Sequence, residues 1–355
     1  MATFFSLDAA RRIGDKNQLM KMSKLINWGR IDYKVRRINK NLGDGKTGGV
    51  VPYDALCMFK AILLQNWHCL SDAGLEDALN VRIDFMLFCG FDISDDIPDE
   101  STICRFRNKL IEKNLLEKLL NEINSQLSDL GLKVQKANMA VLDATLIESN
   151  SRPKNKILEE EIPEDRNEDE FNENKENNDN QNITNFKEIK SSDPDATWLK
   201  KGKKSIFGYK AFATVDDEGF IDKTMTVPAN ESEINKLEEM IVDAKEFGGD
   251  KGYDSKGNRE ALRARGIKTR IMYKKPKGKP MTIWQKRFNK AISKRRFRVE
   301  QTFGTLKRRF KFTKASYFTT KKVQAQFTLK AICLNLLKAV NKVQLILPEK
   351  QLLTG

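Results

Sequence analysis

The chain has 355 residues, of which 39% are hydrophobic, so it can bury a sizeable core without disulfide bonds. Its five cysteines lack the short spacings of zinc knuckles and redox motifs, and its single histidine, His68, argues against histidine catalysis and His-rich zinc sites. The glycines at 248, 249 and 252 do not have Walker A spacing, so nucleotide hydrolysis is not supported. The net charge of +15 makes a polyanion the first partner to consider.

The first part of the chain has the apolar periodicity of helices. Apolar residues recur at helical spacing over residues 55–67. Ser71 or Asp72 is the expected cap of a second helix that runs through Phe85. No apolar stretch is long enough and free enough of charge to span a membrane, and no signal peptide opens the chain, so we expect a cytoplasmic protein.

A long helix is predicted next. Ser101 is the expected N-cap, and an apolar stripe over residues 106–127 ends near Gly131. Arg105 and Arg107 lie on this helix. They form either a solvated basic face or contacts to phosphate groups.

Beyond Gly131 the pattern changes to strands. A short apolar run, residues 139–142, has the character of a buried strand and ends on Asp143. The elements expected after it are a hairpin (207–215 and 220–227), a helix (231–245), a strand leading into Asp250, a strand (267–273) and a helix (284–310). This order predicts an α/β fold with helices on the faces of a mixed sheet.

Charge is distributed very unevenly. Residues 261–348 hold 25 lysines and arginines and one acidic residue, Glu300. Residues 159–179 hold 11 acidic residues and two basic ones. The wider stretch 150–192 has too few apolar residues to offset the entropy of ordering it, so it is predicted to be a disordered insertion.

Three carboxylates are candidate metal ligands. Phosphodiester cleavage is helped most by two divalent cations, and Mg²⁺ prefers oxygen ligands supplied by a few carboxylates. Asp143 and Asp250 each follow an apolar strand, although an Asp there is usually a turn or cap residue. Glu300 is the only acid in a long cationic segment, and the alternative is an ion pair with Arg296 one helical turn earlier.

The neighbours of Glu300 support the functional interpretation. At about 100° per residue, Arg296, Glu300 and Lys307 fall within roughly 40° on one helix face. That face would present a carboxylate between two cations, where a phosphate backbone could lie. Three further arginines widen the cationic surface, namely Arg298, Arg308 and Arg309.

These residues resemble a known family. Residues 296–308, RFRVEQTFGTLKR, resemble the C-terminal signature of DDE transposases from bacterial insertion sequences, with the Arg, catalytic Glu and Lys at the same offsets. Ser293 replaces the signature's Tyr. Residues 249–255, GDKGYDS, resemble the second motif of the family, and residues 141–145, VLDAT, resemble the first.

Other segments resemble the insertion-sequence-five (InsH-like) branch of that family. They are DPDA (193–196), FGYK (207–210) and the N-terminal DESTICRFR (99–107). Phe212 stands where relatives often carry His. The resemblance covers roughly residues 55–337, except the acidic insertion.

The resemblance implies a ribonuclease-H-like catalytic domain with Asp143 on its first strand, Asp250 after its fourth and Glu300 on a late helix. These three would bind two Mg²⁺ or Mn²⁺ ions, and without metal they should repel one another and leave the site partly disordered. Lys307 would contact a DNA phosphate, and Arg296 would support Glu300 or a phosphate.

The expected function is transposition: metal-dependent cleavage of DNA at the ends of an insertion sequence, followed by 3′-OH strand transfer into target DNA. A helical DNA-binding and dimerisation domain (1–132) would precede the catalytic domain (133–348) and a short tail (349–355). We expect a homodimer on DNA in the bacterial nucleoid, with no nucleotide cofactor and no membrane partner. The alternatives are a nuclease that cuts without joining and a repressor that binds DNA without catalysis.

Overall fold

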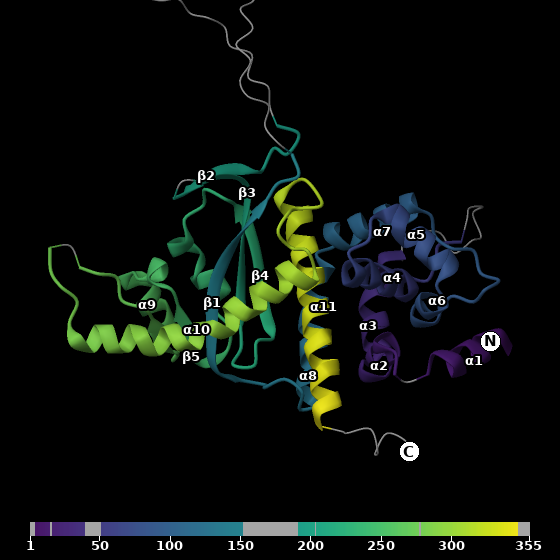
Figure 1. Ribbon diagram of the computed structural model, residues 1–355, viewed down its shortest axis with the longest axis horizontal. Helices are drawn as coiled ribbons and strands as arrows, with labels where there is room; N and C mark the ends of the chain where they lie inside the picture. Colours follow the sequence, from purple (N-terminus) through teal and green to yellow (C-terminus); the bar gives the residue numbers. More distant parts are fainter. Residues whose placement is uncertain are drawn as a thin grey trace, which may run out of the picture.

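The computed structural model describes residues 4–14, 16–39, 51–151, 191–202, 204–276 and 278–346. In these ranges, a group of N-terminal helices lies beside a mixed sheet, and two long helices run between and across them (Figure 1). Most of the predicted acidic insertion, residues 152–190, lies outside the described residues, as does the tail. No helix in the described ranges is long and apolar enough to cross a membrane.

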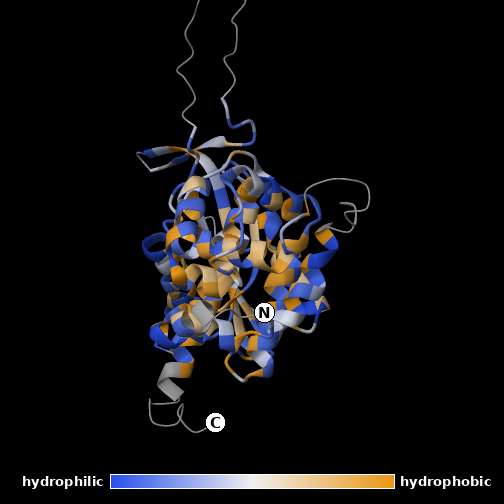
Figure 2. Cartoon of the chain, turned by 90° about the vertical axis from the view of Figure 1, so that its right-hand side faces the viewer, coloured by the Kyte–Doolittle hydropathy of each residue, from blue (hydrophilic) through white to orange (hydrophobic). Residues whose placement is uncertain are grey.

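The N-terminal part is helical, as predicted. Its helices are α1 (Phe4–Ile13), α2 (Gln18–Leu25), α3 (Trp28–Val35), η1 (Arg36–Asn39), α4 (Ala55–His68), α5 (Asp72–Val81), α6 (Ile83–Cys89), α7 (Glu100–Glu112) and α8 (Leu115–Asp129). Seen from their side, these helices carry interleaved polar and apolar stripes (Figure 2). Ser71 caps α5, because its side chain accepts a hydrogen bond from the Gly74 amide.

Two predicted helices are each divided in two. The prediction of one helix from Ser101 to Gly131 was wrong, because Asn114 adopts a left-handed conformation with φ 50° and separates α7 from α8. The N-cap is Asp99 rather than Ser101, with its carboxylate 2.6 Å from the Thr102 amide. The helix expected to run through Phe85 is also broken, since α5 ends at Val81 and α6 begins at Ile83.

The six strands within the described residues form one sheet. They are β1 (Ala137–Glu148), β2 (Thr197–Lys201), β3 (Lys204–Val215), β4 (Ile221–Pro228), β5 (Ala244–Gly249) and β6 (Lys268–Ile271). Central β1 pairs antiparallel with β3 and parallel with β5, which in turn pairs parallel with β6. β2 and β4 pair with opposite halves of β3. This mixed sheet with flanking helices confirms the ribonuclease-H-like prediction.

The segment between the hairpin and β5 is not the regular helix that was predicted for residues 231–245. It consists of two short 3₁₀ turns, η2 (Glu233–Lys236) and η3 (Glu238–Met240), and the strand β5 already begins at Ala244. Leu237 and Met240 are fully buried against the sheet. This segment connects β4, which pairs with β3, to β5, which pairs with the other edge of β1. Burial of Leu237 and Met240 holds the segment against the sheet.

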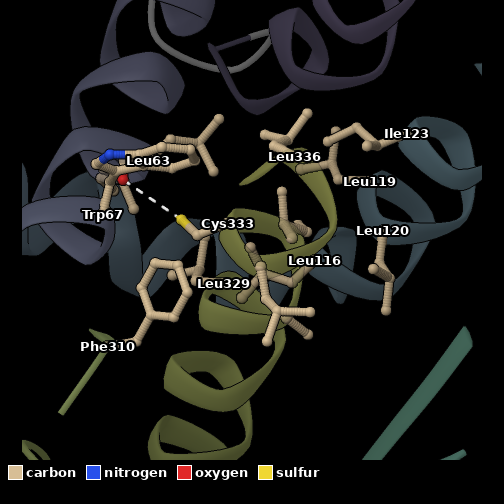
Figure 3. Packing of buried hydrophobic residues seen from close by; sticks show 14 of the residues in the cluster. Leu63, Trp67, Leu116, Leu119, Leu120, Ile123, Phe310, Leu329, Cys333 and Leu336 are labelled. Carbon is tan, nitrogen blue, oxygen red and sulfur yellow. Dashed lines mark hydrogen bonds between the residues drawn. The ribbon is translucent and has the colours of Figure 1, made fainter. Parts of the chain in front are cut away.

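The core on one face of the sheet is continuous with the core of the N-terminal helices. The helix α11 (Thr320–Ile346), which the sequence analysis did not identify, lies between them and packs against β4 on one side and α8 and α4 on the other (Figure 1). Figure 3 shows Leu329 and Leu336 of α11 among Leu116 and Leu119 of α8, and Cys333 donating to the Leu63 carbonyl. Because α11 is buried on several sides, it has no single apolar stripe to reveal it.

The backbone of β1 lies very close to Gly208 of β3. A Cβ atom there would lie 2.1 Å from the Ile147 carbonyl oxygen and 2.8 Å from the Ser149 amide nitrogen. Beside this point the buried Asp193 accepts hydrogen bonds from the Ser149 hydroxyl, the Tyr209 hydroxyl and the Thr319 amide. DPDA (193–196) and FGYK (207–210) are two of the segments that resemble the family. They therefore connect the end of β1, the strand β3 and the start of α11.

Gly208→Ala should destabilise the protein by about 3 kcal/mol, because the backbone of β1 must shift to admit the methyl group. Gly257→Ala is the control, since nothing lies within 4 Å of a Cβ at that position in the helix α9 (Lys256–Ala264). There the change should stabilise by about 0.5 kcal/mol through helix propensity. Urea unfolding of both variants tests this, and equal effects would contradict the close contact.

Candidate active site

The alternation of side chains along β1 fixes the position of Asp143. Met139 and Val141 point to the sheet face that packs in the larger core, whereas Ala140 and Leu142 belong to the smaller core on the opposite face. Asp143 shares the face of Met139 and Val141. The strand does not end on Asp143, as was predicted, but continues to Glu148, so the carboxylate projects from the middle of the central strand.

Asp250 lies beside Asp143 because of the strand register. Leu142 is paired with Gly249 across the parallel strands β1 and β5, so the residue that follows each of them in the chain is an aspartate. Asp250 caps the short turn η4 (Lys251–Tyr253), and its Oδ1 accepts a hydrogen bond of 2.8 Å from the Gly252 amide. A larger residue in place of Gly249 would be crowded, because its Cβ would lie 3.0 Å from the Tyr253 ring.

Glu300 comes from the helix α10 (Ile283–Arg309), which crosses β1 (Figure 1). Val299 and Phe303 are buried in the larger core and set the rotation of the helix. The Thr302 hydroxyl donates to the Gly219 carbonyl and fixes its axial position. With these neighbours turned inward, Glu300 faces the site with 58% of its side chain exposed.

The guanidinium group of Arg296 lies between the three carboxylates. One Nη atom is 2.9 Å from Asp143 Oδ2 and 4.0 Å from Glu300 Oε1, and the other is 3.8 Å from Asp250 Oδ2. The three candidate ligands therefore converge, as the sequence suggested, but Arg296 neutralises part of their repulsion. The sequence analysis expected a partly disordered site without metal because it did not consider Arg296 as a counter-ion for all three carboxylates.

Arg296 is largely buried, and only 14% of its side chain is exposed. Burial alone would lower its pKa, but the charges of Asp143, Asp250 and Glu300 and the hydrogen bond with Asp143 outweigh it and raise the pKa. The guanidinium therefore stays charged. The ion pair between Arg296 and Glu300 that was the alternative interpretation is present, but as one part of a four-residue cluster.

The basic residues chosen from the sequence differ in their environment. Arg298 and Arg308 are exposed on α10, and Lys307 is half-buried on the same helix. Arg309 is held against the N-terminal helices, because its guanidinium donates to the Trp67 carbonyl at 3.1 Å. Arg105 is exposed and bonds to hydroxyl groups of its own helix.

The structure argues against Arg107 as a DNA contact. Only 4% of the residue is exposed, and its guanidinium forms two hydrogen bonds, of 2.5 and 2.7 Å, with Asp72. It also lies over the Tyr317 ring. Arg107 joins α7 to α5 and to the segment before α11, which is a structural role that helical spacing could not distinguish from a surface role.

Comparison with known proteins identifies the family. The model of the transposase DDE domain matches residues 137–336, and that of a second transposase domain (DUF772) matches residues 7–109. The chain is 37% identical over 242 residues to the transposase for insertion sequence element IS1106 of Neisseria meningitidis serogroup B, covering 67% of this chain and 78% of that one. The chain belongs to the DDE transposase family. It is a DNA-cleaving and strand-transferring enzyme, as the sequence predicted.

A solved structure of the piggyBac transposase synaptic complex with hairpin DNA is also similar, with a TM-score of 0.43 and 9% identity, over 95% of this chain and 78% of that one. The comparisons do not distinguish the insertion-sequence-five branch, which stays a prediction.

Membership of the family implies that the transposase uses divalent metal and acts on DNA. The three carboxylates are an all-oxygen donor set, which fits a hard divalent cation. In the described ranges, no three His, Cys, Asp or Glu residues lie close enough together to hold a metal ion. The guanidinium of Arg296 lies among the three carboxylates instead.

Tyr253 is a site residue that the sequence analysis missed. It is fully buried, and its hydroxyl has no hydrogen-bond partner among the described residues. Burial, followed by the charges of Glu233, Asp143 and Asp250, raises its pKa, so the hydroxyl stays protonated beside these carboxylates. The signal for Tyr253 was its place in the GDKGYDS segment, which was used only to locate Asp250.

Tyr253→Phe should raise the stability of the metal-free transposase by about 1 kcal/mol, because it removes a buried hydroxyl that lacks a partner. Tyr209→Phe is the control, since its hydroxyl donates to the buried Asp193 and its loss should destabilise. Thermal unfolding in EDTA measures both. A loss of stability in Tyr253→Phe would show that the hydroxyl makes a favourable interaction.

Proposed function

We propose that Asp143, Asp250 and Glu300 are the catalytic residues and hold the divalent metal of the transposase, two Mg²⁺ or Mn²⁺ ions. The observation that carries this proposal is the convergence of the three carboxylates, from a central strand, the end of its parallel neighbour and a crossing helix, around one positive charge. A site that binds a guanidinium through three carboxylates is also suited to a metal cation.

When bound, two divalent cations would activate the attacking oxygen and stabilise the leaving oxygen of an in-line displacement. In the first displacement, water attacks a phosphodiester at the end of the element and releases a 3′-OH group. In the second, that 3′-OH attacks a phosphodiester of the target, so one P–O bond forms as another breaks and no covalent enzyme intermediate is needed. The carboxylates keep the site negative, and Lys307 holds a phosphate near the cleaved end.

The DNA would lie along α10. Arg298 and Arg308 are exposed on this helix, one before and one after Glu300 in the chain, and add positive charge to it. Arg309 and Arg105 are further candidates on the side of the N-terminal helices. We leave Arg107 out of this set because it is bound to Asp72.

The larger assembly is part of the same proposal. Residues 1–132 would bind the terminal repeats of the element and dimerise, because two ends must be brought together, and residues 133–348 would form the catalytic domain. The enzyme would act as a homodimer on DNA in the bacterial nucleoid. The continuous core between the N-terminal helices and α11 supports a fixed orientation between the two parts.

Asp143→Asn, Asp250→Asn and Glu300→Gln should each reduce cleavage and joining by at least about 10³-fold, as loss of several kcal/mol of transition-state stabilisation requires. Glu246→Gln is the matched control, because this carboxylate lies on β5 near the site but pairs with Arg270 and Arg295. It should leave the rate unchanged. The assay uses labelled element ends, a target plasmid and Mn²⁺.

The same assay separates the alternatives. Cleavage without joined product would favour a nuclease, and DNA binding without either product would favour a repressor. Full activity of Asp250→Asn would contradict the ligand assignment.

Arg308→Ala should weaken nonspecific DNA binding and reduce the slope of log K against log salt by about 1, as loss of one phosphate contact does. Arg107→Ala should leave that slope unchanged but destabilise the fold by about 3 kcal/mol, because Asp72 loses its partner. Fluorescence anisotropy over a salt series and thermal unfolding measure the two effects. A reduced slope in folded Arg107→Ala would contradict the structural role.

A further inference from the structure

The interaction of Arg296 with the triad suggests a second role for this residue. Its guanidinium forms ion pairs with Asp143, Asp250 and Glu300 at once. Asp143 is also shielded from solvent, with 17% of its side chain exposed. The positive charge is therefore placed among the oxygens that a metal cation would need.

We propose that Arg296 is an internal counter-ion that occupies the metal site of the metal-free transposase and must withdraw before divalent cations bind. The inference rests on the proposed function, because it takes the three carboxylates as the metal ligands. Arg296 is thus a positioning residue whose position controls access to the site.

Competition follows from geometry and charge. Asp143 Oδ2 is engaged by the guanidinium at 2.9 Å, so the same oxygen cannot bind a metal ion closely without losing that contact. A guanidinium and a divalent ion a few ångströms apart also repel, most strongly where water is excluded. The two cations are therefore alternative occupants of the site.

The guanidinium can be released without breaking ion pairs to other described residues. Arg296 Nε is buried and has no hydrogen-bond partner among the described residues. Within those residues, the ion pairs of the guanidinium are with the three carboxylates. Its attachment to the site therefore depends on charge pairing, which a metal ion replaces. Glu300, one turn further along α10, is the most exposed of the three and provides the open side.

DNA supplies the alternative partner. A phosphate lying along α10 would accept the released guanidinium, with the bidentate geometry that arginine favours. DNA binding would then remove the competitor for the metal, and metal binding would free an arginine for DNA. By linkage, each ligand should tighten the binding of the other.

The opposing interpretation predicts the opposite sign. If Arg296 only held the carboxylates in place for the metal, its removal would loosen the ligands and weaken metal binding. If it competes with the metal, its removal strengthens metal binding in the absence of DNA. Metal affinity, rather than catalytic activity, is therefore the deciding measurement.

The experiment titrates Mn²⁺ into the full chain by calorimetry, with and without a short DNA duplex of arbitrary sequence at low salt. Arg296→Gln should bind Mn²⁺ at least about tenfold more tightly than the unmodified chain without DNA, which corresponds to about 1.4 kcal/mol. The strengthening by DNA should shrink in the variant. In EDTA its melting temperature should fall, and Mn²⁺ should raise it by more than in the unmodified chain.

Arg295→Gln is the matched control for the loss of one positive charge. This neighbour on α10 is 59% exposed and pairs with Glu246, so its Mn²⁺ affinity should stay within about twofold of the unmodified chain. Arg296→Lys covers the case in which Arg296→Gln fails to fold. It keeps the charge but lacks the planar fork that contacts three carboxylates, so its Mn²⁺ affinity should rise by about threefold.

Unchanged or weaker Mn²⁺ binding in the folded Arg296 variants overturns the inference. The combined variant Arg296→Gln and Asp250→Asn tests the proposed function separately. It should lose the Mn²⁺ binding that Arg296→Gln shows. If binding persists there, the ligand assignment fails, whatever the result for Arg296 alone.

Discussion

The crossing of α10 over the central strand is the constraint on which the site depends. Val299 and Phe303 are buried against the sheet, so the helix cannot rotate without exposing them. This fixed rotation places Arg296 over Asp143 and turns Glu300 toward the open side. The apolar packing of one helix face therefore determines the arrangement of the charges on the other.

That arrangement concentrates three negative charges where the sheet would otherwise bury apolar side chains. Asp143 shares its face of β1 with Met139 and Val141, and a carboxylate there is stable only with a cation nearby. Arg296 provides that cation within the same chain. Arg296 stabilises the metal-free fold by pairing with the carboxylates, and a metal ion must displace it. Stability of the metal-free fold and affinity for metal are therefore opposed at this position.

The sequence predicted the parts of the site that depend on local pattern. A strand before Asp143, a strand before Asp250 and a helix carrying Arg296, Glu300 and Lys307 were all identified from periodicity and charge. Contacts between distant segments were not predictable in this way. Arg107 has the same helical spacing as an exposed residue, and only the fold shows that Asp72 lies against it. The break at Asn114 depends on one left-handed residue within an apolar pattern that is continuous on both sides.

The two departures from the family pattern have different structural consequences. Ser293 is exposed on α10, so a smaller side chain there removes no buried contact from the helix. Phe212 is fully buried in the smaller core, opposite Ala144 of β1, and an imidazole in its place would need a polar partner among apolar neighbours. Phe212 therefore contributes apolar packing behind the central strand. Because that strand carries Asp143, apolar packing on its far face helps to hold the carboxylate in position beneath α10.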